Sequence, residues 1–291
     1  MTGANQLRFD VIWSKYRTAS DERIPSESYY FSGFTYDYYR GLDFKLSWQF
    51  KQMMTTVNQE TNPDNGFFLT TNIYRNYDKF IQDFGINEDF GTLATNFRNN
   101  YYWKIEHEGE YYHKYPLVRR LVGTFRWQVG WISKYDLDSF FNFFAGGLPG
   151  LRGYPFYSIE GRNRFSLHYT WRFPLFREKE IRLLSFDLQN AFLATYVEAG
   201  NAWNKVKGYP EMNWSEFTLN AGGIVKAITA DFKRDVGIQL RLSGFSFYAY
   251  PTAISLDFVY GLDEFTVVDS QEIAHQYGKE WRSYLTILFG L

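Results

Sequence analysis

The side chains best placed for chemistry are Ser166 and His168, two residues apart in a segment that alternates between apolar and polar positions. On one strand face they could be a nucleophile and its base. Such neighbours rarely meet in hydroxyl-to-imidazole geometry, however, and no residue that would orient the histidine is evident. The G-x-S-x-G pattern is also absent, which excludes a patatin-like lipase domain within this chain. We therefore interpret His168 as a polar structural residue and predict no enzymatic activity.

Metal and redox chemistry find equally little support. The sequence contains no cysteine, which excludes disulfides, thiolate metal sites and cysteine nucleophiles. The four histidines, His107, His113, His168 and His275, lack metal-ligand spacing, so we predict no metal and no other cofactor. The formal net charge is -1, which provides no basic field and argues against a nucleic-acid partner.

A single cation, Arg152, stands in the middle of the irregular stretch 145-AGGLPGLRGYPFYSIEG-161, which runs directly into an alternating segment. An arginine in a confined, partly desolvated place needs a carboxylate partner, and a guanidinium can bind one through two hydrogen bonds. We expect Gly147 and Gly153 where the backbone needs close approach or a positive φ. Tyr154 is expected to pack beneath the tip of this stretch.

The elements that must position these residues show a period of two. Residues 42–51 alternate without a break between apolar and polar side chains, and the same pattern recurs at 7–13, 121–131, 236–243 and 254–262. Soluble sandwiches alternate too, but these segments have the roughly 9 to 12 residues that a tilted strand needs to cross a bilayer. Aromatic residues gather near the segment ends, as in the girdles of outer-membrane barrels.

The sequence therefore predicts an all-β transmembrane antiparallel up-and-down barrel that forms one domain over residues 1–291. Helical periodicity is nearly missing, with 219–232 as the one ambiguous window, and no apolar run is long enough for a membrane helix. About twelve strands are expected, near 6–16, 28–38, 42–54, 66–76, 90–98, 100–110, 118–133, 162–174, 189–203, 234–243, 253–262 and 282–291.

An even strand number places both termini on the periplasmic side of a bacterial barrel. With twelve strands, 39-YRG-41 becomes a short periplasmic hairpin. The longer connections then fall on the outer side, at 17–27, 55–65, 134–161, 204–233 and 263–281.

Three motifs together resemble the bacterial surface antigen superfamily of outer-membrane barrels, which includes the BamA and TamA assembly factors and the two-partner secretion translocases. The tip Leu151-Arg152-Gly153-Tyr154 resembles the (V/I/L)-R-G-(F/Y) motif of the family's inward-folded sixth loop, and 171-WRFPLF-176 resembles its R-x-P-L strand end. The stretch 196-YVEAG-200 resembles F-x-D-x-G, with Tyr196 for Phe and Glu198 for Asp. The resemblance is specific over roughly 140–291 and only architectural before that.

The resemblance implies that 134–161 folds into the lumen and that Arg152 binds the carboxylate of Glu198, which lies two residues before Gly200. Asp257 is a competing acidic partner on a later strand. The loop glycines of the motif are Gly146, Gly147 and Gly161. The last strand resembles the C-terminal insertion signal of outer-membrane proteins through Tyr284, Leu285, Ile287, Phe289 and Leu291, although that signal more often ends in Phe or Trp.

The function implied by the resemblance is insertion of proteins into the outer membrane or translocation of polypeptides across it, without enzymatic chemistry. The expected partners are the lipid bilayer of the outer membrane, polypeptide substrates, and periplasmic or lipoprotein partners. Alternatives are a passive channel or structural barrel with a loop-constricted pore, and an adhesin displaying 204–233 or 263–281. Because the family's barrels have sixteen strands and Met1 stands almost inside a strand, we interpret the sequence as a C-terminal portion, with a reduced barrel as the alternative.

Overall fold

A computed structural model gives the structure of the chain. It describes residues 2–20, 34–53, 63–86, 93–116, 118, 120–205, 222–223, 225–247, 250–268 and 272–289. The strands are β1 (Thr2–Ser20), β2 (Phe34–Met53), β3 (Gly66–Ile86), β4 (Leu93–Lys114), β5 (Val122–Ile132), β6 (Phe143–Phe144), β7 (Glu160–Gly161), β8 (Asn163–Phe176), β9 (Ile181–Leu183), β10 (Phe186–Trp203), β11 (Lys233–Ser246), β12 (Tyr250–Gly261), β13 (Phe265–Val268), β14 (Ala274–Tyr277) and β15 (Trp281–Phe289). Two short 3-10 helices, η1 (Ser139–Phe141) and η2 (Phe156–Ser158), lie between β5 and β8.

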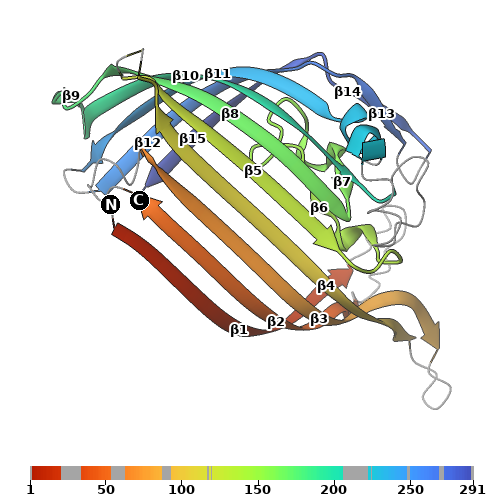
Figure 1. Ribbon diagram of the computed structural model, residues 1–291. Helices are drawn as coiled ribbons and strands as arrows, with labels where there is room; N and C mark the ends of the chain where they lie inside the picture. The colour runs from red at the N-terminus through yellow and green to blue at the C-terminus, as the bar shows by residue number, and fades with distance from the viewer. Residues whose placement is uncertain are drawn as a thin grey trace, which may run out of the picture.

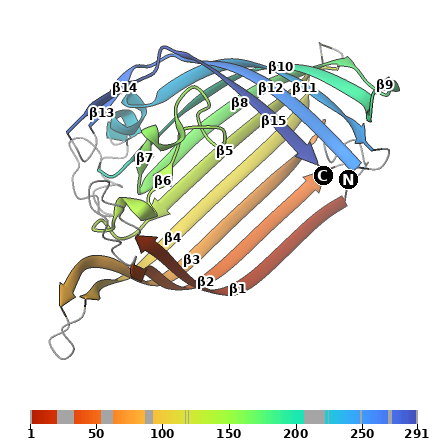
Figure 2. The same cartoon turned by 180° about the vertical axis from the view of Figure 1, so that it is seen from behind.

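One long antiparallel sheet makes up most of the molecule, in the order β1-β2-β3-β4-β5-β8-β10-β11-β12-β15, with β9 beside β10. The sheet curves into an open barrel, and the N- and C-terminal ends lie at the same end of it (Figures 1 and 2). Within the described residues, β1 and β15 are not paired with each other. The all-β, up-and-down fold expected from the sequence is confirmed.

The two faces of the strands explain the alternation in the sequence. On β1, Leu7 and Trp13 are 71% and 70% exposed on the convex face, where a bilayer would cover them. The concave face carries hydrogen-bonded polar groups, such as Glu108 of β4, whose Oε1 accepts from Arg126 Nε of β5 at 2.6 Å. No helix of the described residues is long and apolar enough to cross a membrane. Residues 225–230, in the ambiguous window of the sequence, are helical.

The structure corrects the prediction at 39-YRG-41. The segments predicted as separate strands at 28–38 and 42–54 belong to the continuous strand β2, in which Tyr39 pairs with Tyr16 of β1 and with Phe80 of β3. Gly41 makes room for a side chain instead of turning the chain, since a Cβ there would lie 2.2 Å from the Tyr39 hydroxyl. Residues 28–33 lie outside the described part of the chain.

The predicted strands 90–98 and 100–110 are likewise one strand, β4, which pairs with β3 from Leu93 to Tyr112. The asparagines at 99 and 100, where the two predicted strands meet, pair in register with Lys79 and Asp78. The main path of the sheet among the described residues therefore has ten strands instead of twelve. The number stays even, so both termini still share one end of the barrel.

Because β2 is a single strand, the connection that follows it lies at the opposite end of the barrel from the one predicted. The connection 55–65 was expected on the outer side, but it follows the end of β2 that pairs with Thr2 and so belongs to the end that holds the termini, here called the terminal end. Asp64 accordingly pairs with Lys114 at 3.3 Å and with Arg177 at 3.2 Å, both at that end. Residues 55–62 lie outside the described part.

The segment 134–161 enters the space enclosed by the sheet from the opposite end, here called the loop end, where β6 and β7 lie on the concave side (Figure 2). Its buried cluster consists of Ala145, Leu151, Tyr154 and Ile159, against which Ala202 of β10 packs. A small core thus forms between this loop and the wall, and a second buried cluster of Tyr102, Ile132, Leu137 and Phe143 packs where the loop begins.

Candidate functional site

The inward loop turns sharply at two glycines before it reaches the wall. Gly147 has a φ of +76°, in the left-handed region that favours glycine. At Gly146 a Cβ would lie 2.1 Å from the Pro155 carbonyl oxygen, so the two arms of the loop approach as closely as backbones can. This path brings residues 151–154, the loop tip, to the concave face of β10, β11, β12 and β15.

Arg152 binds two carboxylates on different strands. Its Nε and Nη2 donate to Glu198 Oε1 at 2.9 and 2.6 Å, and its backbone N–H donates to Glu198 Oε2 at 2.9 Å. Its Nη1 donates to Asp257 Oδ1 at 2.8 Å. The two oxygens of Asp257 also accept from Gln239 Nε2 at 3.0 and 3.1 Å. The two acids named as alternatives from the sequence therefore share one guanidinium.

The ring of Tyr196 packs against one face of the Arg152 guanidinium. The Arg152 Cζ lies 3.5 Å from the centroid of the Tyr196 ring, a cation–π contact that is worth about 2 kcal/mol when it is desolvated. On the neighbouring strand, Gly237 pairs with Tyr196, and a Cβ at Gly237 would lie 2.3 Å from the Tyr196 Cζ. The missing side chain of Gly237 therefore lets the ring lie flat between the wall and the arginine.

The ion pairs at Arg152 are largely removed from water. The side chain of Arg152 is 15% exposed, and those of Glu198 and Asp257 are 2% exposed. Burial lowers the pKa of Arg152, but the charge and hydrogen bonds of Glu198 together with the charge of Asp257 outweigh burial and raise that pKa above its ordinary value. Carboxylates buried this deeply need a charged partner, and Arg152 supplies it.

The backbone of the loop tip makes two further contacts with the wall. Gly153 N donates to Asp235 Oδ2 of β11 at 2.8 Å, and a Cβ on Gly153 would lie 2.9 Å from the Gly261 Cα. The carbonyl of Arg152 accepts from the Tyr284 hydroxyl of β15 at 2.8 Å. Only a glycine at position 153 lets the tip approach the wall closely enough for these bonds.

Tyr154 fixes the far side of the tip. Burial raises the pKa of Tyr154 to about 12, so its hydroxyl stays protonated and donates to the Arg234 carbonyl at 2.7 Å. The same oxygen accepts from the Asp263 N–H at 3.0 Å. The ring contacts Phe265 of β13, with centroids 5.6 Å apart. Tyr154 therefore packs in the core and also hydrogen-bonds to Arg234 of β11 and to Asp263, two residues beyond the end of β12.

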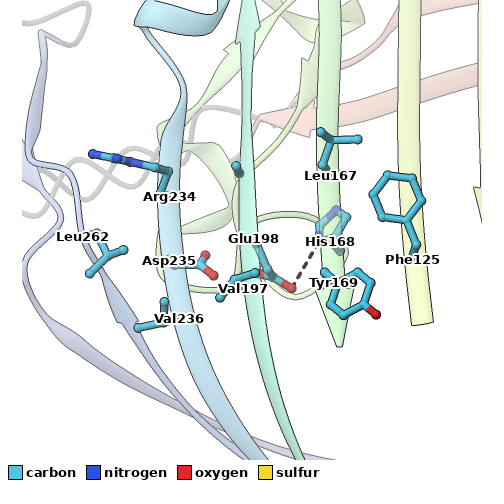
Figure 3. A pocket seen from close by; sticks show the side chains of 11 residues that line it. Phe125, Leu167, His168, Tyr169, Val197, Glu198, Arg234, Asp235, Val236 and Leu262 are labelled. Carbon is cyan, nitrogen blue, oxygen red and sulfur yellow. Dashed lines mark ion pairs between the residues drawn. The ribbon is translucent and has the colours of Figure 1, made fainter. Parts of the chain in front are cut away.

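Ser166 and His168 lie beside this site, and Glu198 contacts the histidine. His168 Nε2 is 3.1 Å from Ser166 Oγ. On its other side, His168 Nδ1 is 3.1 Å from Glu198 Oε1 (Figure 3). The sequence did not reveal this orienting carboxylate. Ser166 is nonetheless 0% exposed, and its hydroxyl donates to Gln128 Oε1 at 3.2 Å. The serine proton is therefore turned away from the histidine, opposite to what a general base needs.

A hollow of about 340 Å³ lies over the same strands. Leu167, Val197 and Val236 line it from the outward positions that alternate with the inward carboxylates of Glu198 and Asp235 (Figure 3). Because its lining side chains are mainly apolar, we assign no chemistry to this hollow.

The remaining residues predicted for the site pack against strands. A Cβ at Gly161 would lie 2.2 Å from Trp203 N, and one at Gly200 would lie 2.6 Å from the Phe165 carbonyl oxygen. On β15, Tyr284 faces inward to the loop tip, whereas the outward side chains of Leu285, Ile287 and Phe289 are exposed. Leu291 lies outside the described residues.

Sequence reasoning missed Asp235 and the hydrogen bond of Tyr284. The alternation of their strands places both side chains on the inward face, but it places many other polar side chains there as well. Alternation alone therefore could not single out these two residues. Glycine at 153 is the one available signal for Asp235, since a backbone in close contact with a wall needs an acceptor for its N–H.

The sequence was compared with protein families and with curated proteins. Residues 2–246 match the Omp85 superfamily domain. A comparison with curated proteins found no match.

Proposed function

The chain belongs to the Omp85 superfamily, and from that membership we propose that it inserts or translocates polypeptides at the free edge of β15 while the loop tip holds the adjoining wall rigid. As a member of the family it is an integral outer-membrane protein, and its activity is transport or assembly without enzymatic chemistry. Its substrates are polypeptides in general.

The observation that carries the proposal is the set of strands that the loop tip contacts. Glu198 lies on β10, Asp235 on β11, Asp257 on β12 and Tyr284 on β15, and all four bind Arg152 or Gly153. These are the last four strands of the sheet order, ending at the edge strand. One loop therefore joins the strands that lead to this edge.

The edge strand itself offers hydrogen-bonding groups to another chain. β15 pairs with β12 on one side, and within the described residues no strand pairs with its other side. An open edge can accept an extended segment by β-augmentation, in which backbone hydrogen bonds supply the affinity. A rigid wall behind β15 would keep this edge straight while a substrate strand pairs with it. Periplasmic or lipoprotein partners are proposed to deliver substrate at the terminal end.

Insertion in lipid vesicles tests this function. Vesicles carrying the protein are mixed with an unfolded outer-membrane barrel substrate, and its insertion is measured by protease protection beside the conductance of a planar bilayer. We expect Arg152→Met to lose most of the insertion activity with little change in conductance. Arg162→Met is the control, because this arginine directly follows the loop and donates to the Leu137 carbonyl at 3.4 Å, away from the tip.

A passive channel predicts the reverse result. If the loop merely constricts a pore, deletion of residues 146–156 should open a large steady conductance, and Arg152→Met should raise the current. Normal insertion by a correctly folded Arg152→Met variant would contradict the proposed role of the loop tip.

A further inference from the structure

The inward loop has a second attachment, far from its tip. Before it reaches Arg152, the chain forms η1, and Phe140 and Phe141 of this helix contact aromatic side chains on the wall formed by β2, β3 and β4. We call these five rings, Phe140 and Phe141 with Tyr39, Phe80 and Tyr102, the aromatic clasp.

The geometry of the clasp is that of a packed aromatic cluster. The Phe80 ring lies 5.3 Å from that of Phe140 and 5.4 Å from that of Phe141. The ring of Tyr102 lies 5.8 Å from that of Phe141, and that of Tyr39 lies 6.0 Å from it. Stacked and edge-to-face contacts at these distances are favourable beyond the area that they bury.

The wall side of the clasp is held in place by a buried carboxylate. The hydroxyls of Tyr39 and Tyr102 donate to the two oxygens of Asp78 at 3.1 and 2.7 Å, and Asp78 is 1% exposed. Gly41 provides the space in which the Tyr39 side chain lies over the strand. Both tyrosine rings are therefore held by contacts within the wall as well as by the loop residues that pack on them.

Polar contacts flank the clasp on the loop side. Lys134 Nζ donates to Asn100 Oδ1 at 2.6 Å, and Asp136 pairs with Arg98 of β4. The first part of the loop is thus tied to β4 by charge as well as by aromatic packing. The tip, in contrast, is tied to β10, β11, β12 and β15, which lie toward the other end of the sheet order.

We propose that Phe140 and Phe141 are positioning residues that make the loop a tie across the barrel, with one end on the β2–β4 wall and the other on the β10–β15 wall. The tie sets the separation of β1 and β15, the outermost strands of these two walls. The inference rests on the proposed function, because a substrate at the β15 edge requires this separation to be controlled.

Distances between two spin labels test the tie directly. The natural sequence has no cysteine, so Val11→Cys on β1 and Leu285→Cys on β15 provide two unique labelling sites, both on exposed side chains. We expect the Phe140→Ala/Phe141→Ala variant in vesicles to show a broader distribution shifted to longer distances. Phe156→Ala/Tyr157→Ala is the matched control, since this neighbouring pair in η2 packs on Phe144 within the loop itself.

Combining the two ends of the tie sharpens the test. Both variants weaken the same tie, so adding Arg152→Met to the clasp variant should shift the distance by less than Arg152→Met shifts it alone. Heat-modifiable gel migration verifies that each variant is folded. An unchanged distance in the folded clasp variant, or shifts that simply add, would overturn the proposal.

The proposed function and the tie can fail separately. A shifted distance in the clasp variant, together with no substrate insertion by the wild-type protein, would leave the tie standing and refute the proposed function. Lost insertion with an unchanged distance would refute the tie, because the clasp would then act by another route.

Discussion

Replacing Arg152 with methionine should lower the free energy of unfolding by about 3–5 kcal/mol, the usual cost of removing one partner from a buried ion pair. The cost arises because Glu198 and Asp257, each 2% exposed, lose their shared cation and cannot regain water. Methionine keeps part of the packing over the Tyr196 ring. The loss of the cation–π contact is therefore already included in the about 3–5 kcal/mol.

A second substitution separates charge from packing. Arg152→Met leaves the buried charge of Glu198 without a partner, and Glu198→Gln removes that charge. In the Arg152→Met background, Glu198→Gln should therefore restore about 1–3 kcal/mol of the free energy of unfolding. In the wild-type background the same change should destabilise, because it weakens three hydrogen bonds from Arg152. The sign of the effect of Glu198→Gln should therefore reverse between the two backgrounds.

The assay is urea unfolding of the refolded barrel in vesicles, followed by the fluorescence of its nine tryptophans and analysed by linear extrapolation. Arg162→Met is the control. If Glu198→Gln destabilises the Arg152→Met variant as much as the wild type, the electrostatic reasoning is refuted. The charge exchange Arg152→Glu with Glu198→Arg is a poorer test, because it places a carboxylate against Asp257 and a guanidinium against His168.

Three further outcomes are expected. Tyr196→Phe should stabilise the fold by about 1 kcal/mol in the same assay, since its buried hydroxyl has no hydrogen-bond partner among the described residues. Gly237→Ala should cost about 1–3 kcal/mol by displacing the Tyr196 ring, whereas Gly222→Ala, with nothing within 4 Å, should be neutral. Burial favours a higher pKa for Asp64, but Arg177 and Lys114 together lower the pKa below its ordinary value. Because the folded-state pKa is the lower one, the stability lost in Asp64→Asn should be constant above about pH 4 and disappear at lower pH, as measured by unfolding midpoints; a pH-independent difference would contradict this.

The strands could be predicted because their two faces meet different surroundings. The β8 and β10 to β12 strands were expected within a few residues of their observed bounds, since a bilayer on one side and a polar interior on the other impose a period of two. Strand ends were harder to place. Gly41 leaves room for the Tyr39 side chain and does not form a turn, and a single sequence does not distinguish these two reasons for a glycine.

Contacts of the site were predictable only where a motif marked them. The resemblance pointed to Arg152 and Glu198, and alternation made Asp257 a second candidate, but neither could show that both acids bind at once. Phe140 and Phe141 carry no local signal, because their partners on β2 to β4 precede them along the chain and are brought near only by the curvature of the whole sheet.

The loop tip also has a consequence for the order in which the barrel forms. Arg152 contacts Glu198, Asp257 and Tyr284, which follow it by 46, 105 and 132 residues. Contacts of such separation form late, because the entropy of closing the intervening chain must be overcome first. Tyr284 belongs to the last strand, so the tip cannot complete its bonds until that strand has paired. The seated loop therefore marks the completion of folding and does not nucleate it.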